Sequence, residues 1–182
     1  SKLNNKRIFF SEHLISQDSI VMTYCGSLSG YYMIDEMLKF YEALSRVKKN
    51  VFFLLITKDR NIILDKIENK NYKSKIICVE AEWHNVPFLL SMSSFMVSFI
   101  KPTFAKIASS PTKVAEAFAL GIPVISNSGI GDLDELIIKF DLGGIININN
   151  NNYDNYIKCN MDKILTFSKQ TIINNSINIF DI

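Results

Sequence analysis

The chain has 182 residues, 48% of them apolar, which is enough for one domain around a single buried core. Its 20 Lys and Arg nearly balance its 18 Asp and Glu, and no basic run with interleaved aromatic residues is present, so nucleic acid is not an expected partner. Three scattered cysteines without a C-x-x-C pair, no leader peptide and no apolar run of membrane-spanning length predict a soluble protein of the reducing cytoplasm, with neither a disulfide framework nor a zinc site.

The opening residues 1–18 lack clear periodicity and are predicted to be a linker or an edge segment. Residues 19–182 are predicted to form one domain, because short apolar runs there alternate with segments of helical period. The apolar runs predict six strands, at Ser19–Cys25, Val51–Thr57, Lys75–Val79, Phe95–Ile100, Pro123–Ser126 and Gly144–Ile148.

Helical periodicity is clearest in Tyr32–Lys48, where Ile34, Met37 and Tyr41 share one face. Further helices are predicted at Asn61–Asn69, Val86–Met92, Pro111–Leu120 and Asp132–Phe140. The polar Asn147–Asn155 stretch is predicted to be a loop before a C-terminal helix. Repeated β-α-β units with right-handed crossovers predict an α/β fold, a doubly wound, Rossmann-like parallel sheet of about six strands with helices on both faces.

Ligands of doubly wound sheets bind beyond the carboxyl ends of the strands, so the loops there are the candidate binding elements. The first loop is Gly26-Ser27-Leu28-Ser29-Gly30. Its glycines allow a ligand to approach the backbone closely. It does not match G-x-G-x-x-G, and a tight turn that needs glycine only for its geometry is an equal alternative.

The second loop ends in a helix that begins near Ser110 and Pro111, a good N-cap and a good first helical residue, and that ends at Gly121. Lys113 falls in the first turn, where a cation opposes the helix dipole by about 0.3–1 kcal/mol. The free amides of this turn, at Ser110 and Thr112, and the Lys113 ammonium are therefore predicted to hold a diphosphate. Glu116 follows on nearly the same side and is predicted to accept hydrogen bonds from ribose hydroxyls. The alternative is a solvated Lys113–Glu116 pair.

The third loop, Asn127 to Asp132, contains Gly129 and Gly131, which can admit a sugar or a phosphate or serve a plain connection. Asp132-Leu133-Asp134 matches the D-x-D signature of metal-dependent transferases. Because this triplet opens a predicted helix, no metal site is expected there.

These residues resemble the C-terminal domain of the GT-B glycosyltransferases of family 4, the group 1 transferases. The resemblance rests on Tyr24-Cys25-Gly26-Ser27-Leu28, on Asn85-Val86-Pro87 and on Ile100-Lys101-Pro102. Its most specific part is Ser110-Pro111-Thr112-Lys113 with Glu116-Ala117-Phe118-Ala119-Leu120-Gly121-Ile122-Pro123-Val124-Ile125. The similarity extends over about Ser19 to Ile148.

The resemblance implies transfer of a sugar from a nucleotide donor, commonly UDP-linked, with retention of configuration and without a metal or other cofactor. The ribose-binding glutamate of the family falls on Glu116. The other motif glutamate of the family falls on Ala108, and Ser27 stands where the family commonly has Arg. Lys101, Lys106 or Lys113 is then expected to supply phosphate charge, and Lys113 is the expected catalytic residue, since catalysis of this class stabilises the departing diphosphate.

The resemblance also implies partners that this chain does not contain. They are an N-terminal GT-B domain, which contributes the acceptor site, and an acceptor that is a saccharide or a lipid-linked glycan at the cytoplasmic face of a membrane. His84 is not expected to be a catalytic base, because an isolated histidine is more often structural. A nucleotide-sugar epimerase of the same fold and a non-catalytic nucleotide-binding or scaffold module are the alternatives.

Overall fold

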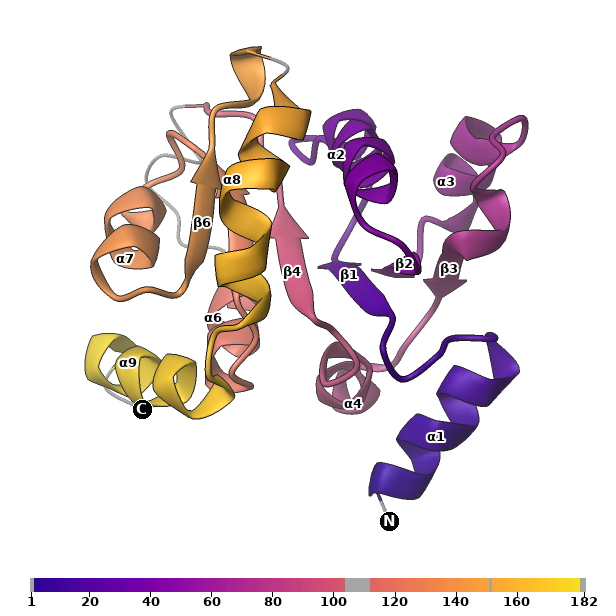
Figure 1. Ribbon diagram of the computed structural model, residues 1–182, viewed down its shortest axis with the longest axis horizontal. Coiled ribbons are helices and arrows are strands. Elements are labelled where there is room, and N and C mark those ends of the chain that lie inside the picture. Colours follow the sequence, from indigo (N-terminus) through magenta and orange to yellow (C-terminus); the bar gives the residue numbers. More distant parts are fainter. Residues whose placement is uncertain (1, 104–111, 151, 181–182) are drawn as a thin grey trace.

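Six parallel strands form one sheet in the computed structural model, which describes residues 2–103, 112–150 and 152–180 (Figure 1). The strands are β1 (Ile20–Cys25), β2 (Val51–Ile56), β3 (Ile76–Val79), β4 (Phe95–Ser98), β5 (Val124–Asn127) and β6 (Gly143–Ile146). Their order across the sheet is β3-β2-β1-β4-β5-β6. The order reverses between β1 and β4, and a doubly wound sheet opens its ligand crevice at such a switch point. The predicted fold class and all six strands are confirmed.

The strands are buried on both faces, which explains their continuous apolar sequences. All six residues of β2, Val-Phe-Phe-Leu-Leu-Ile, are buried. Successive side chains point to opposite faces, so Phe53 and Leu55 join one hydrophobic cluster, and Phe52 and Leu54 join the other. β1 and β2 pair in register from Ile20 opposite Val51 to Cys25 opposite Ile56, so the loops that follow them begin side by side.

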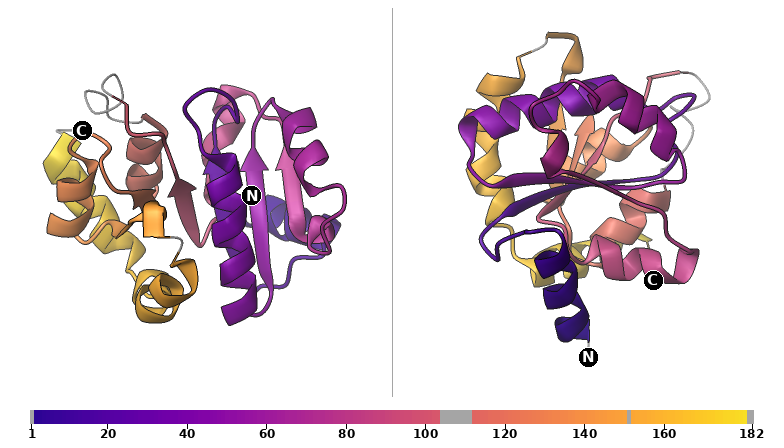
Figure 2. Two further views of the ribbon diagram at one scale, coloured as in Figure 1. Left: turned by 90° about the horizontal axis from the view of Figure 1, so that it is seen from above. Right: turned by 90° about the vertical axis from the view of Figure 1, so that its right-hand side faces the viewer.

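Helices cover each face of the sheet (Figure 2). One face is covered by α2 (Ile34–Val47), α3 (Arg60–Ile67) and α8 (Tyr153–Leu165). The other is covered by α4 (Val86–Leu90), α6 (Thr112–Ala119), α7 (Leu133–Lys139) and α9 (Lys169–Phe180). Short 3₁₀ turns at Lys73–Lys75 (η1), Trp83–Asn85 (η2) and Ile148–Asn150 (η3) complete the connections. The predicted helices are confirmed, and their ends differ from the predicted ends by no more than two residues.

The two ends of the chain differ from the prediction. The opening segment, expected as a linker or an edge segment, contains helix α1 (Lys2–Glu12). Three consecutive apolar residues, Ile8 to Phe10, hide any helical period, and the helix is held instead by packing of Phe9 and Phe10 against the second cluster. At the other end two helices, α8 and α9, replace the single predicted one, and α8 already begins within the predicted Asn147–Asn155 loop.

Gly121 ends α6 in the left-handed conformation, with a φ of 71°. The amide of Gly121 donates to Phe118 O at 2.8 Å, and the amide of Ile122 donates to Ala117 O at 2.9 Å. A side chain at this position would place its Cβ 2.6 Å from the backbone oxygen of Lys169, the first residue of α9. Glycine is therefore required here both for the turn and for the approach of α9.

We predict that Gly121→Ala lowers the free energy of unfolding by about 2 kcal/mol or more, because it combines a left-handed alanine with a backbone clash. Gly30→Ala is the matched control, since Gly30 has the same φ of 71° and no atom within 4 Å of a Cβ at that position. Urea unfolding of both variants measures the difference. An equal decrease in the free energy of unfolding in the two variants would show that the approach of α9 does not require glycine at position 121.

Candidate functional site

A cavity of about 410 Å³ lies at the carboxyl edge of the sheet, within the size range of small-molecule sites. It is built by the loops after β1 and β2, by the segment after β3 and by the first turn of α6. Its lining residues are Cys25, Gly26, Ser27, Ile56, Thr57, Lys58, Asp59, Ala81, Val86 and Lys113. The predicted residues Gly26, Ser27 and Lys113, far apart in the sequence, thus line one cavity.

Hydrogen bonds to β2 and from Tyr24 hold the loop after β1 in place. The Gly26 amide donates to Ile56 O at 3.0 Å, which extends the pairing of β1 with β2 by one residue. The buried Tyr24 hydroxyl donates to Ser27 O at 2.5 Å. Burial raises the pKa of Tyr24 well above its usual value, so this hydroxyl keeps its proton and remains a donor. The loop therefore presents a fixed backbone to the cavity.

Asp59, at the start of the segment after β2, closes the other side of this loop. One carboxylate oxygen, Oδ2, accepts hydrogen bonds from Ser27 Oγ and from the Leu28 amide, each at 2.7 Å. These two bonds favour the charged form and lower the pKa of Asp59. Because two donors of the loop are engaged by Asp59, the loop is tied to β2 as well as to β1.

Lys113 lies in the first turn of α6, as predicted, and Glu116 lies one turn further on. The Lys113 ammonium donates to both oxygens of Glu116, at 2.7 Å to Oε1 and 2.8 Å to Oε2. Both side chains are partly exposed, at 38% and 42%. The pair that we considered as the alternative is present, and it offsets the unfavourable place of a cation at a helix start. Such an exposed pair contributes little to stability.

Cys25, the last residue of β1, also lines the cavity. Burial raises the pKa of its thiol to about 11, while the Lys113 charge lowers it and the Glu116 charge raises it. The thiol is therefore neutral at physiological pH. Cys25 is therefore a small apolar part of the cavity lining rather than a reactive nucleophile.

The loops after β4 and β5 are joined by the buried amide of Asn127. The Ile100 amide donates to Asn127 Oδ1 at 2.7 Å, and Asn127 Nδ2 donates back to Ile100 O at 2.9 Å. The next residue, Lys101, donates its own amide to Tyr31 O at 2.8 Å, in the loop after β1. The Lys101 side chain is exposed to solvent, and it is not among the residues that line the 410 Å³ cavity.

The D-x-D triplet that follows the start of the third predicted loop has a structural role. Asp134 Oδ2 accepts a hydrogen bond from the Gly129 amide at 3.0 Å, so the D-x-D triplet helps to shape the turn between β5 and α7. Gly129 and Gly131 both have positive φ, at 87° and 53°. They lie at the carboxyl edge but outside the described lining of the cavity. The exposed Thr112 begins α6, whereas Lys106, Ser110 and Ala108 lie outside the described residues.

Sequence reasoning missed Lys58 and Asp59. Both directly follow β2, so the rule that placed candidate sites after strands applies to them equally. Their loop contains no glycine, the residue that marks the loops after β1 and β5. The two histidines take no part in the described lining: His13 stacks on Phe9 at 4.3 Å, and His84 meets Trp83 edge-on at 5.8 Å between ring centroids.

Comparison with protein families matches residues 5–166 to the model described as glycosyl transferases group 1. Comparison with curated proteins found no match. In the described part of the chain no helix is both long and apolar enough to span a bilayer.

Several solved structures share the fold. A glycosyltransferase of Rickettsia africae is 18% identical, with a TM-score of 0.72 over 97% of this chain and 48% of its own. The C-terminal domain of a group 1 glycosyl transferase, LpcC, of Francisella tularensis is 12% identical, with a TM-score of 0.69 over 97% of this chain and 93% of that domain. HepE of Anabaena, solved with UDP and glucose, is 12% identical, with a TM-score of 0.69 over 96% of this chain and 48% of its own. This chain thus spans about half the length of the Rickettsia enzyme and of HepE.

Proposed function

This chain belongs to the group 1 glycosyl transferases, and on that premise we propose that its carboxyl-edge cavity binds a nucleotide sugar, of the UDP-linked kind. The sugar is transferred to a saccharide or a lipid-linked glycan with retention of configuration, without a metal or other cofactor. The observation that carries this proposal is the meeting of Lys113 with the Gly26-Ser27 loop in one cavity. The family match favours this function over the epimerase and the scaffold module.

The diphosphate is assigned to the start of α6 and the facing loop. Lys113 would turn from Glu116 toward the phosphates, where its charge agrees with the helix dipole and the free amides. Lys58 lines the same cavity and adds a second cation from the loop after β2. This lysine supplies charge that the family commonly draws from an arginine at the position of Ser27. Lys101 and Lys106 are further candidate cations at the same edge.

The ribose is assigned to Glu116. Departure of Lys113 would free both carboxylate oxygens, which can accept hydrogen bonds from two vicinal hydroxyls. Phosphate and ribose binding are then linked, because the same movement of Lys113 prepares both contacts. The solved complex of HepE with UDP and glucose supports a nucleotide and a sugar as ligands of this fold.

The chemical step is electrostatic in this proposal. The bond between the anomeric carbon and the diphosphate oxygen breaks, and its electron pair leaves with the phosphate. The acceptor hydroxyl oxygen bonds to the same carbon, and its proton passes to the departing phosphate. Negative charge therefore grows beside Lys113, which stabilises it more strongly when water is excluded. Exclusion of water and the acceptor site are assigned to a facing N-terminal GT-B domain, and this chain is then the C-terminal, donor-binding half of a cytoplasmic enzyme that can act at the membrane surface.

The first functional prediction concerns ribose. Glu116→Ala should weaken UDP binding at least about tenfold, since hydrogen bonds to a charged group contribute about 1.5–3 kcal/mol. Glu116→Gln is the matched variant, because it keeps one acceptor and should lose less. Titration calorimetry with UDP and with 2′,3′-dideoxyuridine diphosphate measures the effect. Unchanged UDP affinity in a folded Glu116→Ala protein would rule out this role.

The second prediction concerns phosphate. Lys113→Ala should weaken binding of UDP more than binding of uridine, because only UDP carries the charge that Lys113 meets. The difference should shrink as salt is raised from low to physiological ionic strength. Lys58→Ala is expected to act in the same direction. Equal weakening of both ligands would indicate a structural role for Lys113 instead.

The third prediction concerns the chain alone. These 182 residues should bind UDP in roughly the micromolar to millimolar range, about 4–8 kcal/mol, and should transfer no sugar. Water around the diphosphate weakens the electrostatic stabilisation of the leaving group when no second domain faces the cavity. A radiolabelled-sugar assay on this chain and on a full-length enzyme, each with and without EDTA, tests transfer and metal independence. Robust transfer by this chain alone would contradict the proposal.

A further inference from the structure

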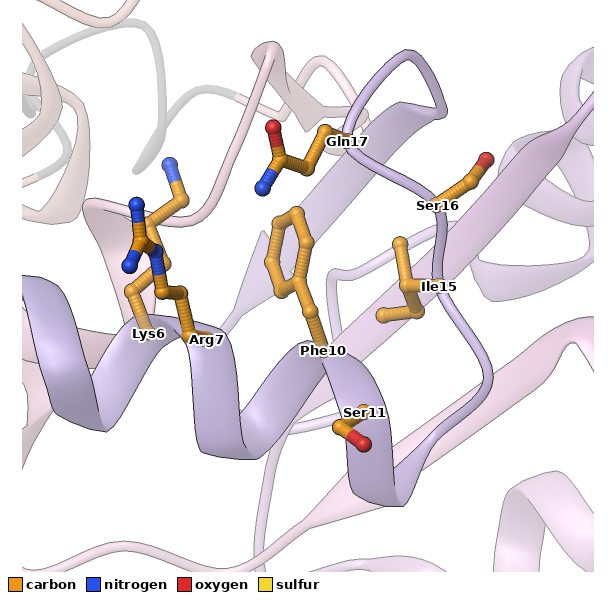
Figure 3. Close-up of a pocket in the computed structure, with 7 residues that line it drawn as sticks. All are labelled: Lys6, Arg7, Phe10, Ser11, Ile15, Ser16 and Gln17. Atoms are coloured by element: carbon orange, nitrogen blue, oxygen red, sulfur yellow. The ribbon is translucent and has the colours of Figure 1, made fainter.

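A second cavity, of about 640 Å³, lies between α1 and the segment that leads into β1 (Figure 3). It is lined by Lys6, Arg7, Phe10, Ser11, Ile15, Ser16 and Gln17. These residues precede β1, whereas the candidate nucleotide site follows it. The six residues of β1 therefore separate the two cavities by roughly 15–20 Å, at opposite edges of the sheet.

Polar groups converge around an aromatic ring in this cavity. Lys6 and Arg7 extend from α1 toward the same side, and Gln17 reaches over Phe10 from the loop (Figure 3). The Lys6 ammonium lies 5.3 Å from the centre of the Phe10 ring and donates to Ser91 O at 3.3 Å. No acidic side chain is among the described residues that line the cavity. Its surface thus combines positive charge with an apolar wall of Phe10 and Ile15.

The two cations of this lining, Lys6 and Arg7, are neighbours on α1. Burial lowers the pKa of Lys6, and the positive charge of Lys169 lowers it further. Within the described ranges, Lys6, Arg7 and Lys169 form no salt bridge. Two cations without an acidic side chain in the described lining give this cavity a positive potential that attracts an anion.

We propose that this cavity binds a phosphate group. Lys6, Arg7 and the side-chain amide of Gln17 hold the phosphate, and the carbon chain of the ligand lies against Phe10 and Ile15. Phosphate suits this set because it accepts several charge-assisted hydrogen bonds at once. Arginine in particular can bind it through two parallel bonds. The phosphate ester is either a soluble metabolite or a phospholipid headgroup, and both share this chemistry. The proposal does not rest on the proposed function, because the two cavities share no residue.

Two probes distinguish a soluble phosphate ester from a phospholipid headgroup. Glycerol phosphate in titration calorimetry represents a soluble ester, and cosedimentation with vesicles of phosphatidylglycerol, against vesicles of phosphatidylcholine, represents a headgroup. We expect binding to at least one of the two anionic probes, weakened as salt is raised. The Lys6→Gln/Arg7→Gln variant should bind at least about tenfold more weakly, through loss of two charge-assisted contacts.

The matched control is Lys39→Gln/Lys66→Gln, which removes the same charge from lysines paired with Glu36 and Asp35 on another part of the surface. It should keep full binding, and both variants should keep their melting temperature and their affinity for UDP. Binding of glycerol phosphate would identify a soluble ester, and binding of anionic vesicles alone would identify a headgroup. Failure of both probes, or equal weakening by the two double variants, would overturn the proposal.

Discussion

The paired hydrogen bonds between the Asn127 amide and the backbone of Ile100 hold the carboxyl edge of this sheet together. Both residues are buried, and each bond takes the place of one that water cannot make there. A buried donor or acceptor left without a partner costs about 1–3 kcal/mol, so the two loops are constrained to leave their strands side by side. From Ile100 the constraint passes through Lys101 to Tyr31, and so to the loop after β1. Three loops of the edge are thereby joined by hydrogen bonds.

On the other side of β1, Asp59 adds further hydrogen bonds to the loop after β1. It binds Ser27 and Leu28 from the loop after β2, so the backbone of Gly26 and Ser27 is defined before any ligand arrives. Preorganised donors are more effective than flexible ones, since no free energy is spent on ordering them at the moment of binding. The adaptable part of the site is instead the Lys113–Glu116 pair. Its two side chains are partly exposed, so their mutual attraction contributes little to stability.

The opposite edge of the sheet has a different character. There the charge is positive without a nearby acidic side chain in the described lining, and α1 supplies both the cations and an aromatic wall. The domain therefore has two cavities with different linings, one beside the hydrogen-bonded Gly26-Ser27 loop and one beside the basic and aromatic side chains of α1. Strand β1 runs from one cavity to the other.

Much of the architecture follows from local sequence. Continuous apolar runs such as Val51–Ile56 identify strands buried on both faces, and the spacing of Met37, Tyr41 and Leu44 identifies a helix with one buried side. Gly121 marks the end of α6 by its chemistry alone. The position of Lys113 in the first turn of that helix is also a local property, and it is why this residue was predicted correctly to lie at the edge of the sheet.

Other features depend on which strands become neighbours. Lys58 and Asp59 reach the Gly26-Ser27 loop only because β1 and β2 pair with Cys25 opposite Ile56, and a pairing register is a long-range choice that no local pattern encodes. Helix α1 has no clear amphipathic period, and it exists because Phe9 and Phe10 find a surface made by distant elements. The sequence by itself thus determined the elements and the helix start that carries Lys113. The tertiary structure decided which loops meet, because contacts between distant residues form only when the whole core is buried.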